Sequence, residues 1–195
     1  MTTYSDRWER FLDPDVVRPS LFLAAMFITT FEILKDSIVD RIRDFYSIGF
    51  GPDGATVSPG YQREVLSRNK SPIYASLGWL QEHEAITSED VAIYEAMKAT
   101  RNLLAHQLFS VVTGQVESNH SQQFDQLVGL LRKIEVWWVV NIEVPTNPDY
   151  DGQDIDEAGI VPGPVLSLQM LIQVASGSTE LLEHWRKMGN RAAGA

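Results

Sequence analysis

The sequence predicts an all-α protein, a single-domain antiparallel bundle of about five to seven helices. Apolar residues recur every three or four positions over long stretches, as on the buried face of an amphipathic helix. No stretch shows the convincing alternation of a half-buried strand. The chain has 195 residues, 44% of them hydrophobic, which suits one domain (residues 1–195) with an ample core.

Composition excludes several kinds of site and location. The chain has no cysteine, so it has no disulfide framework, thiolate metal site or cysteine nucleophile. Its first residues are polar and acidic and lack the basic and apolar regions of a signal peptide. No apolar run approaches the roughly 20 residues of a membrane span. We therefore expect a soluble, cytoplasmic protein without membrane attachment, metal or cofactor.

The net charge of −10 bears on nucleic-acid binding. Affinity for nucleic acid comes largely from Lys and Arg that neutralise phosphates, so broad electrostatic adhesion is not expected. Acidic residues are concentrated at the N-terminus and in residues 149–157, which leaves other faces less negative. A local positive cleft would be enough for a catalytic site.

The first half of the chain divides at Pro and Gly. Residues 1–19 form a polar lead-in, and apolar residues at helical spacing then predict a long helix over about 20–46. Residues 49–60 contain four Gly and two Pro and are predicted to be a loop. A short helix over about 61–69 follows, and then a helix over about 72–83 that begins at a proline.

The next predicted helix spans residues 88–114. Ser88 is a favourable N-cap residue, acids follow in the first turn, and Gly114 marks the other end. One apolar stripe is expected to face the core: Ile93, Met97, Leu104, Leu108 and Val111. The opposite face is part polar and part apolar, so this helix has a second face that the stripe does not explain.

A long apolar helix is predicted over about 118–144. Trp137 and Trp138, with the valines that follow, widen its apolar surface on several sides. A helix that is apolar all round is covered on all sides. We therefore expect this segment to pack against its own domain and also, through the Trp137/Trp138 surface, against a second subunit.

The remaining residues begin with a long acidic loop, 145–163. Its spacing resembles an EF-hand calcium loop only in part, because Ala158 stands where the bidentate Glu would be required. A helix from about residue 164 and a final amphipathic helix with a capping-box start at Ser178 follow. Residues 190–195 are expected to be a frayed tail.

The second face of helix 88–114 carries the pattern Arg101-Asn102-xxx-His106. Asn102 and His106 are four residues apart and point nearly the same way. Arg101 and His106 diverge by about 140° around the helix axis. These two side chains would therefore meet only through the length of Arg101 or through a second copy of the helix, which indicates a symmetric pairing.

The stretch RNLLAH, residues 101–106, resembles the Arg-x(4)-His signature of the HEPN superfamily of all-α domains. In that family the motif helices of two protomers face each other and the paired Arg and His form a metal-independent endoribonuclease site. The resemblance implies that His106 is the acid/base, Arg101 the phosphate clamp and Asn102 a hydrogen-bonding partner of either. It implies a homodimer acting on RNA, a 2',3'-cyclic phosphate product, and a role as a toxin or in phage defence.

The residue types suit that chemistry. Cutting RNA without a metal needs proton transfer near neutral pH, which His supplies, and a cation for the phosphorane, which the guanidinium fork of Arg supplies. Lys98 could add positive charge and Glu95 could orient His106 or Arg101 across a dimer. Equally, Lys98 and Glu95 could form a solvated (i, i+3) pair.

Two observations leave the function open. HEPN toxins that pair with a nucleotidyltransferase antitoxin commonly carry a Tyr two positions after the His, and here that position is Leu108, so such an antitoxin partner is in doubt. The chain shows no GxSxG elbow or paired ExxH motifs, which disfavours hydrolase and di-metal alternatives. The remaining alternative is a non-catalytic helical dimer that binds nucleotide, RNA or a protein through the same helix face.

Overall fold

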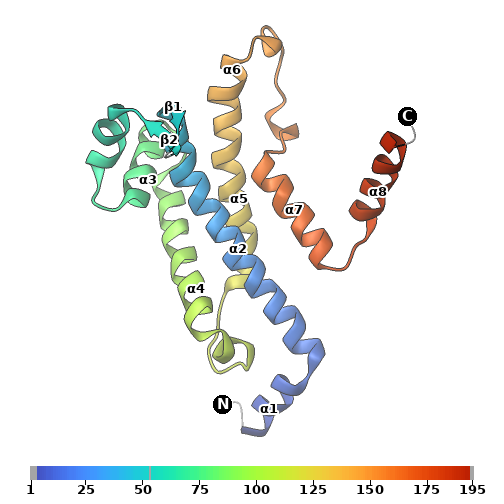
Figure 1. The fold of residues 1–195 in the computed structure, drawn as a ribbon. Helices are drawn as coiled ribbons and strands as arrows, with labels where there is room; N and C mark the ends of the chain where they lie inside the picture. Colours follow the sequence, from blue (N-terminus) through green and yellow to red (C-terminus); the bar gives the residue numbers. More distant parts are fainter. Residues whose placement is uncertain (1–3, 53, 194–195) are drawn as a thin grey trace.

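A computed structural model describes residues 4–52 and 54–193 and shows a mostly helical protein. The long helix α2 lies at its centre, with α3, α4 and α5 packed against it (Figure 1). The elements, in chain order, are α1 (Tyr4–Leu12), α2 (Pro14–Phe45), β1 (Ser47–Gly51), β2 (Gly54–Val57), a π-helix (Tyr61–Val65), a 3-10 helix (Leu66–Arg68), α3 (Pro72–Glu82), α4 (Ser88–Val112), α5 (His120–Trp138), a π-helix (Val139–Glu143), α6 (Val144–Thr146), 3-10 turns at Pro148–Tyr150 and Glu157–Gly159, α7 (Gly163–Ala175) and α8 (Glu180–Ala193).

The N-terminal residues are more helical than the sequence predicted. The described part of the predicted lead-in, 4–19, forms α1 and the start of α2, which begins at Pro14. The Asp13 side chain accepts a hydrogen bond from the backbone N–H of Asp15, and a proline at the first helical position loses no hydrogen bond. Pro19 is accommodated within the helix, one turn later. The long helix therefore starts six residues earlier than expected.

The prediction of a loop over residues 49–60 was wrong in part, because this segment contributes to a β-hairpin. Strands β1 and β2 pair antiparallel, with Phe50 opposite Ala55 and Gly51 opposite Gly54. Gly54 has φ +102°, a conformation that favours glycine. Both strands are largely exposed, so neither needs the alternation of apolar and polar residues that marks a half-buried strand.

Helices α3 and α4 lie close to their predicted bounds. The N-cap of α4 is Thr87 and not Ser88: the Thr87 hydroxyl accepts from the Asp90 backbone N–H, and the Asp90 carboxylate accepts from that of Thr87. This reciprocal capping box fixes the start of the helix. After its end, Gly114 adopts a left-handed conformation with φ +71°.

The core lies between α2, α3, α4 and α5. Its largest members are fully buried: Phe27, Leu34, Ile38, Ile42, Leu77, Leu80, Tyr94, Met97, Leu104, Leu127, Leu131 and Ile134. On α4, Met97 and Leu104 confirm the predicted inner stripe, and Tyr94 and Val112 complete it. The inner face of α4 is therefore committed to its own chain.

Trp138 of the predicted Trp137/Trp138 partner surface is buried by the chain itself, and a contact of Trp137 with a second subunit stays a prediction. Trp138 is only 3% exposed and its ring stacks on Trp79. Trp137 meets the same Trp79 ring edge-on and is half-buried. Much of the apolar surface at the end of α5 thus belongs to an aromatic cluster within the chain, which also includes Phe45.

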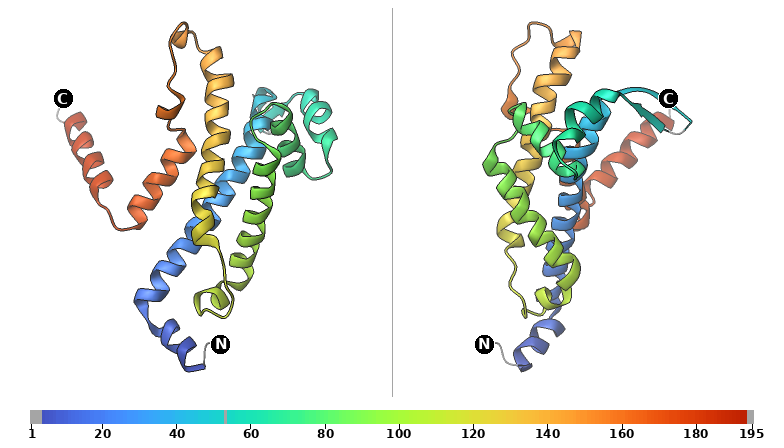
Figure 2. Two further views of the ribbon diagram at one scale, coloured as in Figure 1. Left: turned by 180° about the vertical axis from the view of Figure 1, so that it is seen from behind. Right: turned by 90° about the vertical axis from the view of Figure 1, so that its left-hand side faces the viewer.

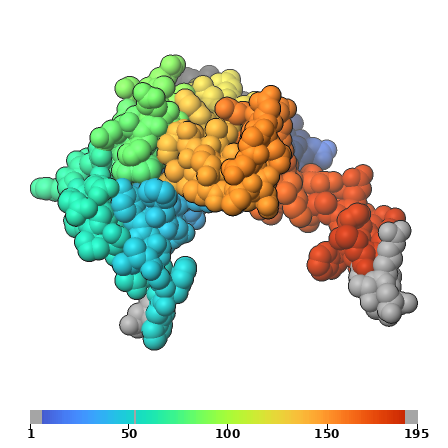
Figure 3. All heavy atoms as spheres, turned by 90° about the horizontal axis from the view of Figure 1, so that it is seen from above, coloured from blue at the N-terminus to red at the C-terminus, as the bar shows by residue number. Residues whose placement is uncertain are grey.

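The last two helices extend away from the rest of the molecule (Figures 1 and 3). α7 packs on α5 and α2, and α8 turns back from its end. α8 continues to Ala193, so most of the predicted tail 190–195 is helical backbone. Residues 194–195 of that tail and 1–3 of the lead-in lie outside the described residues.

Two segments of the described chain are long and apolar enough, by length and composition, to span a membrane: Pro14–Phe45 and Glu157–Ala175. This differs from the expectation based on uninterrupted apolar runs, because a span tolerates a few charges within its window. The first segment is α2, whose buried residues form the centre of the core, and core helices pass the same test.

Candidate functional site

The outer face of α4 is the part of this helix that its own chain leaves largely uncovered, although Phe109 at its end packs edge-on against Phe11 of α1. Figures 1 and 2 show α4 at one side of the molecule, beside α2. On a helical wheel the exposed positions form an arc centred near His106. After the first turn, and apart from Gln107 at the border of the arc, these positions are Ala92, Glu95, Ala96, Ala99, Asn102, Ala105, His106 and Phe109. We call this surface the outer α4 face.

Arg101 lies at the edge of this face and is held by a carboxylate of α2. Its Nε and Nη2 donate to Glu32 Oε1 over 2.9 and 2.5 Å, and Nη1 donates to Asn102 Oδ1 over 3.3 Å. Both side chains of the ion pair are about two-thirds covered. The guanidinium is thereby fixed in position, and Asn102 contacts Arg101 rather than His106.

Glu32 also accepts from Lys35 Nζ over 2.9 Å, so one carboxylate receives two cations. The hydrogen bond from Lys35 is the largest cause that lowers the pKa of Glu32, and Arg101 acts in the same direction against partial desolvation. Glu32 is therefore ionised at neutral pH, and it compensates much of the charge of Arg101.

His106 is exposed, and no hydrogen bond or ion pair joins it to any other residue that the structure describes. The next residue, Gln107, departs from helical geometry, with φ −131° and ψ 26°. The helix is therefore kinked immediately after His106. A solvated imidazole beside a kink is free to meet a ligand or a second chain.

Lys98 and Glu95 lie one turn before the motif. Lys98 Nζ donates to the Tyr74 hydroxyl over 2.5 Å and lies 4.8 Å from the centre of that ring. Its nearest contact with Glu95 is 4.0 Å, a loose (i, i+3) pair. The hydrogen bond to Tyr74 is the largest cause that raises the pKa of Lys98, so this side chain is a cation at neutral pH.

Of the five residues predicted from the sequence, the structure joins Arg101 to Asn102 and brings Lys98 near Glu95. No hydrogen bond or ion pair joins His106 to the other four within one chain. Sequence reasoning missed Glu32 and Tyr74, which hold the two cations from α2 and α3. No sequence pattern marks either residue as a partner of the motif, because each contact depends on how helices that are distant in sequence pack together.

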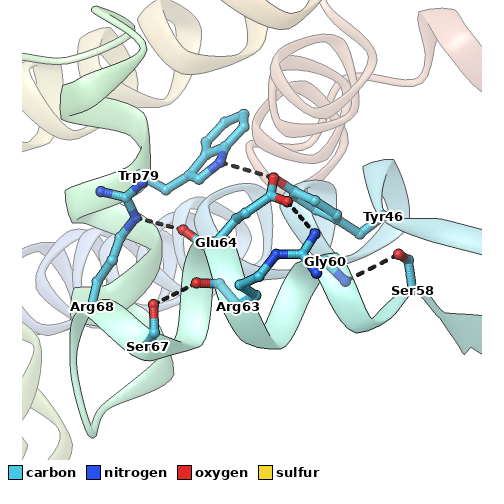
Figure 4. A network of polar contacts seen from close by, with 8 residues as sticks. All are labelled: Tyr46, Ser58, Gly60, Arg63, Glu64, Ser67, Arg68 and Trp79. Carbon is cyan, nitrogen blue, oxygen red and sulfur yellow. Dashed lines mark hydrogen bonds and ion pairs between the residues drawn. The ribbon is translucent and has the colours of Figure 1, made fainter.

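A second polar network lies at the far end of α2 and is structural (Figure 4). The Tyr46 hydroxyl donates to Glu64 over 2.8 Å and accepts from Trp79 Nε1 over 3.3 Å. Burial is the main cause that raises the pKa of Tyr46, so its phenol stays protonated at neutral pH. Arg68 Nε donates to the Glu64 carbonyl over 2.6 Å. These bonds attach the π-helix after the hairpin to α2 and α3.

Comparisons with known proteins add no relative: no family model, curated protein or solved structure matches this chain. Among residues 4–52 and 54–193, no group of three or more His, Asp or Glu is placed to hold a metal ion. The outer α4 face, with its fixed arginine and free histidine, is the surface whose chemistry we interpret.

Proposed function

We propose that this protein is a HEPN-like, metal-independent endoribonuclease whose site is completed by two copies of the outer α4 face. The observation that carries the proposal is the arrangement of that face: a solvated His106 at its centre and a positioned Arg101 at its edge. The two side chains have complementary chemistry and do not meet within one chain. A second α4 lying across the first would bring them together.

In the proposed reaction the RNA 2'-hydroxyl attacks the adjacent phosphorus, and the bond from phosphorus to the 5'-oxygen breaks. One His106 takes the hydroxyl proton, and the His106 of the second copy protonates the leaving oxygen. The products are a 2',3'-cyclic phosphate and a 5'-hydroxyl. An exposed imidazole suits both roles, because one ring nitrogen can accept a proton and the other can donate one.

Arg101 would stabilise the negative charge that develops on the phosphate oxygens. Its bonds to Glu32 and Asn102 use three N–H groups, and the remaining N–H groups can donate to phosphate. The Glu32 contact positions the fork before RNA binds, which reduces the ordering that binding requires. Lys98, half-buried on the same helix, adds a second cation near this edge.

The small residues of the outer α4 face support a close approach of two helices. Ala92, Ala96, Ala99 and Ala105 are all exposed and lie along the same face of α4 as His106. Alanine lets helix backbones approach closely and loses no side-chain entropy when it is covered. Phe109, whose ring packs edge-on against Phe11 of α1, is still 59% exposed at the same face and supplies apolar area that a second copy would cover.

The first test is cleavage of single-stranded RNA in EDTA by the wild type, His106→Ala and His184→Ala. His184 is an exposed histidine on α8, far from α4, and serves as a matched control. We expect the wild type and His184→Ala to cleave, and His106→Ala to lose at least about a hundredfold in rate. An inert wild type on varied RNAs would refute the proposal.

The second test addresses the composite site. Ala99→Glu places a charge on the outer α4 face without disturbing the core, because Ala99 is exposed. We expect this variant to keep its helical circular dichroism, to lose assembly through α4 in light scattering, and to lose RNA cleavage. Ala99→Glu that cleaves RNA at the wild-type rate would show that one chain suffices.

A second candidate function is a non-catalytic helical dimer that binds nucleotide, RNA or protein through the same face. It is favoured by the neutralisation of Arg101 by Glu32 and by the net charge of −10. Under this function the wild type would assemble through α4 and would bind its ligand without cutting RNA. The same cleavage and Ala99→Glu measurements separate the two functions.

A further inference from the structure

The C-terminal end of α4 meets α1 beside the outer α4 face. α1 lies at the end of the molecule where α4 ends and α5 begins (Figures 1 and 2). Phe11 of α1 packs edge-on against Phe109 of α4, with 5.4 Å between the ring centres. Phe109 follows His106 by three residues, and both lie on the outer α4 face. We call this junction the α1/α4 end.

An aromatic hollow of about 130 Å³ lies at the α1/α4 end. Trp8 packs edge-on against Phe11, so that Trp8, Phe11 and Phe109 form one group of rings. The residues that line the hollow are Arg7, Trp8, Phe11, Phe109, Thr113 and Gln115. The three aromatic side chains stay 36% to 59% exposed. Aromatic rings that are open on one side are platforms on which another flat ring stacks.

Two arginines of α1 flank these rings. Arg7 lines the hollow, and its Nε is buried without a hydrogen-bond partner. The Arg10 guanidinium lies over Gly114, where a Cβ would be only 3.3 Å from Arg10 Nε. No ion pair joins Arg7 or Arg10 to a carboxylate of another residue that the structure describes. Their charges are therefore left for a ligand.

A polar pocket of about 670 Å³ lies on the other side of the turn 113–116. Its lining residues are Arg10, Ser20, Val111, Gly114, Val116, Glu117, Ser118, Asn119 and His120. α5 begins here without a side-chain cap, and no hydrogen bond joins the backbone N–H of Ser121 or Gln122 to any described residue. Free N–H groups at the start of this 19-residue helix favour an anion.

His120 gives an independent indication of a ligand in this pocket. Its side chain is only 9% exposed, and its Nδ1 lies 2.9 Å from Ser118 Oγ. Its Nε2 has no partner among the described residues, although the ring lines the pocket. Burial lowers the pKa of His120, so the ring is neutral at pH 7 and offers a hydrogen bond instead of a charge.

The hollow and the pocket together match the two parts of a nucleotide chain. Unpaired RNA alternates flat bases, which stack on aromatic rings, with phosphates, which bind arginine and the N-termini of helices. An apolar peptide would contact the rings but would leave the arginines and the free N–H groups of α5 without partners. Glu117 also lines the pocket, but the charge of Arg10 and the positive end of α5 together exceed its single negative charge.

We propose that the α1/α4 end binds the RNA strand beside the bond that His106 cuts. One unpaired base stacks on the rings of the aromatic hollow, and a neighbouring phosphate binds Arg10 and the N-terminus of α5. The ligand is the strand that reacts at His106, so the inference rests on the proposed function. It specifies single-stranded RNA as the substrate, because a paired base is stacked inside its own duplex and does not reach the rings.

The first test measures binding separately from cleavage. Full-length His106→Ala is titrated into a fluorescein-labelled oligouridylate, and fluorescence anisotropy gives Kd. Phe11→Leu in this background keeps the apolar packing but removes the aromatic face, and we expect a Kd about tenfold higher. Phe11→Tyr should keep the original Kd. Trp185→Leu, at an exposed tryptophan of α8 far from α1, is the matched control and should also leave Kd unchanged.

The second test detects the phosphate contact. Each phosphate that a protein neutralises on a single strand contributes about 0.7 to the slope of log K against log salt concentration. We expect Arg10→Gln to reduce that slope by about 0.7. Arg186→Gln, at an exposed arginine of α8, should leave the slope unchanged. Circular dichroism checks that each variant is folded.

Three outcomes would overturn the proposal. Equal Kd values for Phe11→Leu and Phe11→Tyr would show that the ring only packs within the chain. An unchanged salt slope for Arg10→Gln would show that no phosphate binds there. A duplex of oligouridylate and oligoadenylate bound as tightly as the single strand would exclude base stacking.

Failure of the proposed ribonuclease gives a different result. A wild type that cuts no RNA, while Phe11→Leu and Arg10→Gln still weaken binding as expected, would refute the ribonuclease and leave the RNA-binding surface standing. A wild type that cuts RNA with the same KM as Phe11→Leu would refute this surface and leave the ribonuclease standing.

Discussion

The ion pair that positions Arg101 gives a prediction whose size follows from the structure. Glu32→Gln keeps the shape of the side chain and one carbonyl oxygen but removes the charge that faces Arg101 and Lys35. The three side chains are 31% to 49% exposed, so each pair is screened by solvent. Such pairs contribute about 0.2 to 1 kcal/mol each.

We therefore expect Glu32→Gln to lower the free energy of unfolding by about 1 kcal/mol at pH 7, a fall of about 2 to 4 °C in Tm for a chain of this size. A double-mutant cycle with Arg101→Gln isolates the pair of interest. Its coupling energy should be about 0.5 to 1 kcal/mol. Lys35→Gln provides the same measurement for the second cation.

The pH dependence has a definite sign. The pKa of Glu32 is lowered from its ordinary value of 4.5 in the folded protein, first by the Lys35 hydrogen bond and then by Arg101. A carboxylate with a lowered pKa contributes its full stability above the ordinary pKa and loses it as the pH falls through the folded one. The difference between wild type and Glu32→Gln should be constant above about pH 5 and shrink below about pH 4.5.

Urea unfolding followed by circular dichroism at pH 7 and at a series of acid pH values measures these quantities. Coupling between Glu32 and Arg101 near zero at pH 7 would refute the reasoning, because the contact would then contribute nothing. Coupling that persists unchanged well below the pKa of Glu32 would also refute it, since a protonated carboxyl cannot form the ion pair.

Other substitutions test the burial of the two faces of α4, the cap at its start and the pKa of the buried His120. Leu104→Ala, fully buried, should cost about 3 to 5 kcal/mol in urea unfolding, whereas exposed Asn102→Ala should cost less than about 0.5. Thr87→Ala removes the capping box and should lower the unfolding free energy by about 1 kcal/mol, with Ser88→Ala as a milder control. Burial lowers the pKa of His120, so His120→Gln should flatten the loss of stability as the pH falls below about 6.5; an unchanged pH profile would contradict this.

Helices whose ends are marked by proline, glycine or capping residues could be predicted from the sequence. α3 begins at Pro72, and α4 is bounded by a capping segment and by Gly114, as expected. Buried positions of α4 followed the helical period because one side of the helix faces the core. The pattern of apolar residues therefore predicts a helix well where one face of that helix is buried in the core.

The hairpin and the aromatic cluster could not be predicted in the same way. β1 and β2 are exposed, so no selection for buried alternation marks them in the sequence. Trp137 and Trp138 appeared too apolar for one chain, but Trp79 of α3 stacks on Trp138 and covers part of Trp137. The partner of a broad apolar helix is decided by tertiary packing, which a single sequence does not show.

In the candidate site, too, the features within one helix could be predicted, whereas the contacts between helices could not. The local pattern placed Arg101, Asn102 and His106 on one helix, and their relative directions followed from helix geometry. The pairing of Arg101 with Glu32 joins residues 69 positions apart and depends on how α2 and α4 pack. Lys98 is likewise held by Tyr74 of α3 and only loosely by Glu95.

The central claim is that His106 performs metal-independent transesterification of RNA. The most direct measurement is mass spectrometry of the ends of a single-stranded RNA after incubation with the protein in EDTA. We expect 2',3'-cyclic phosphate and 5'-hydroxyl ends from the wild type and from His184→Ala, and intact RNA with His106→Ala. Products with 3'-hydroxyl ends, or the same cleavage by His106→Ala, would contradict it.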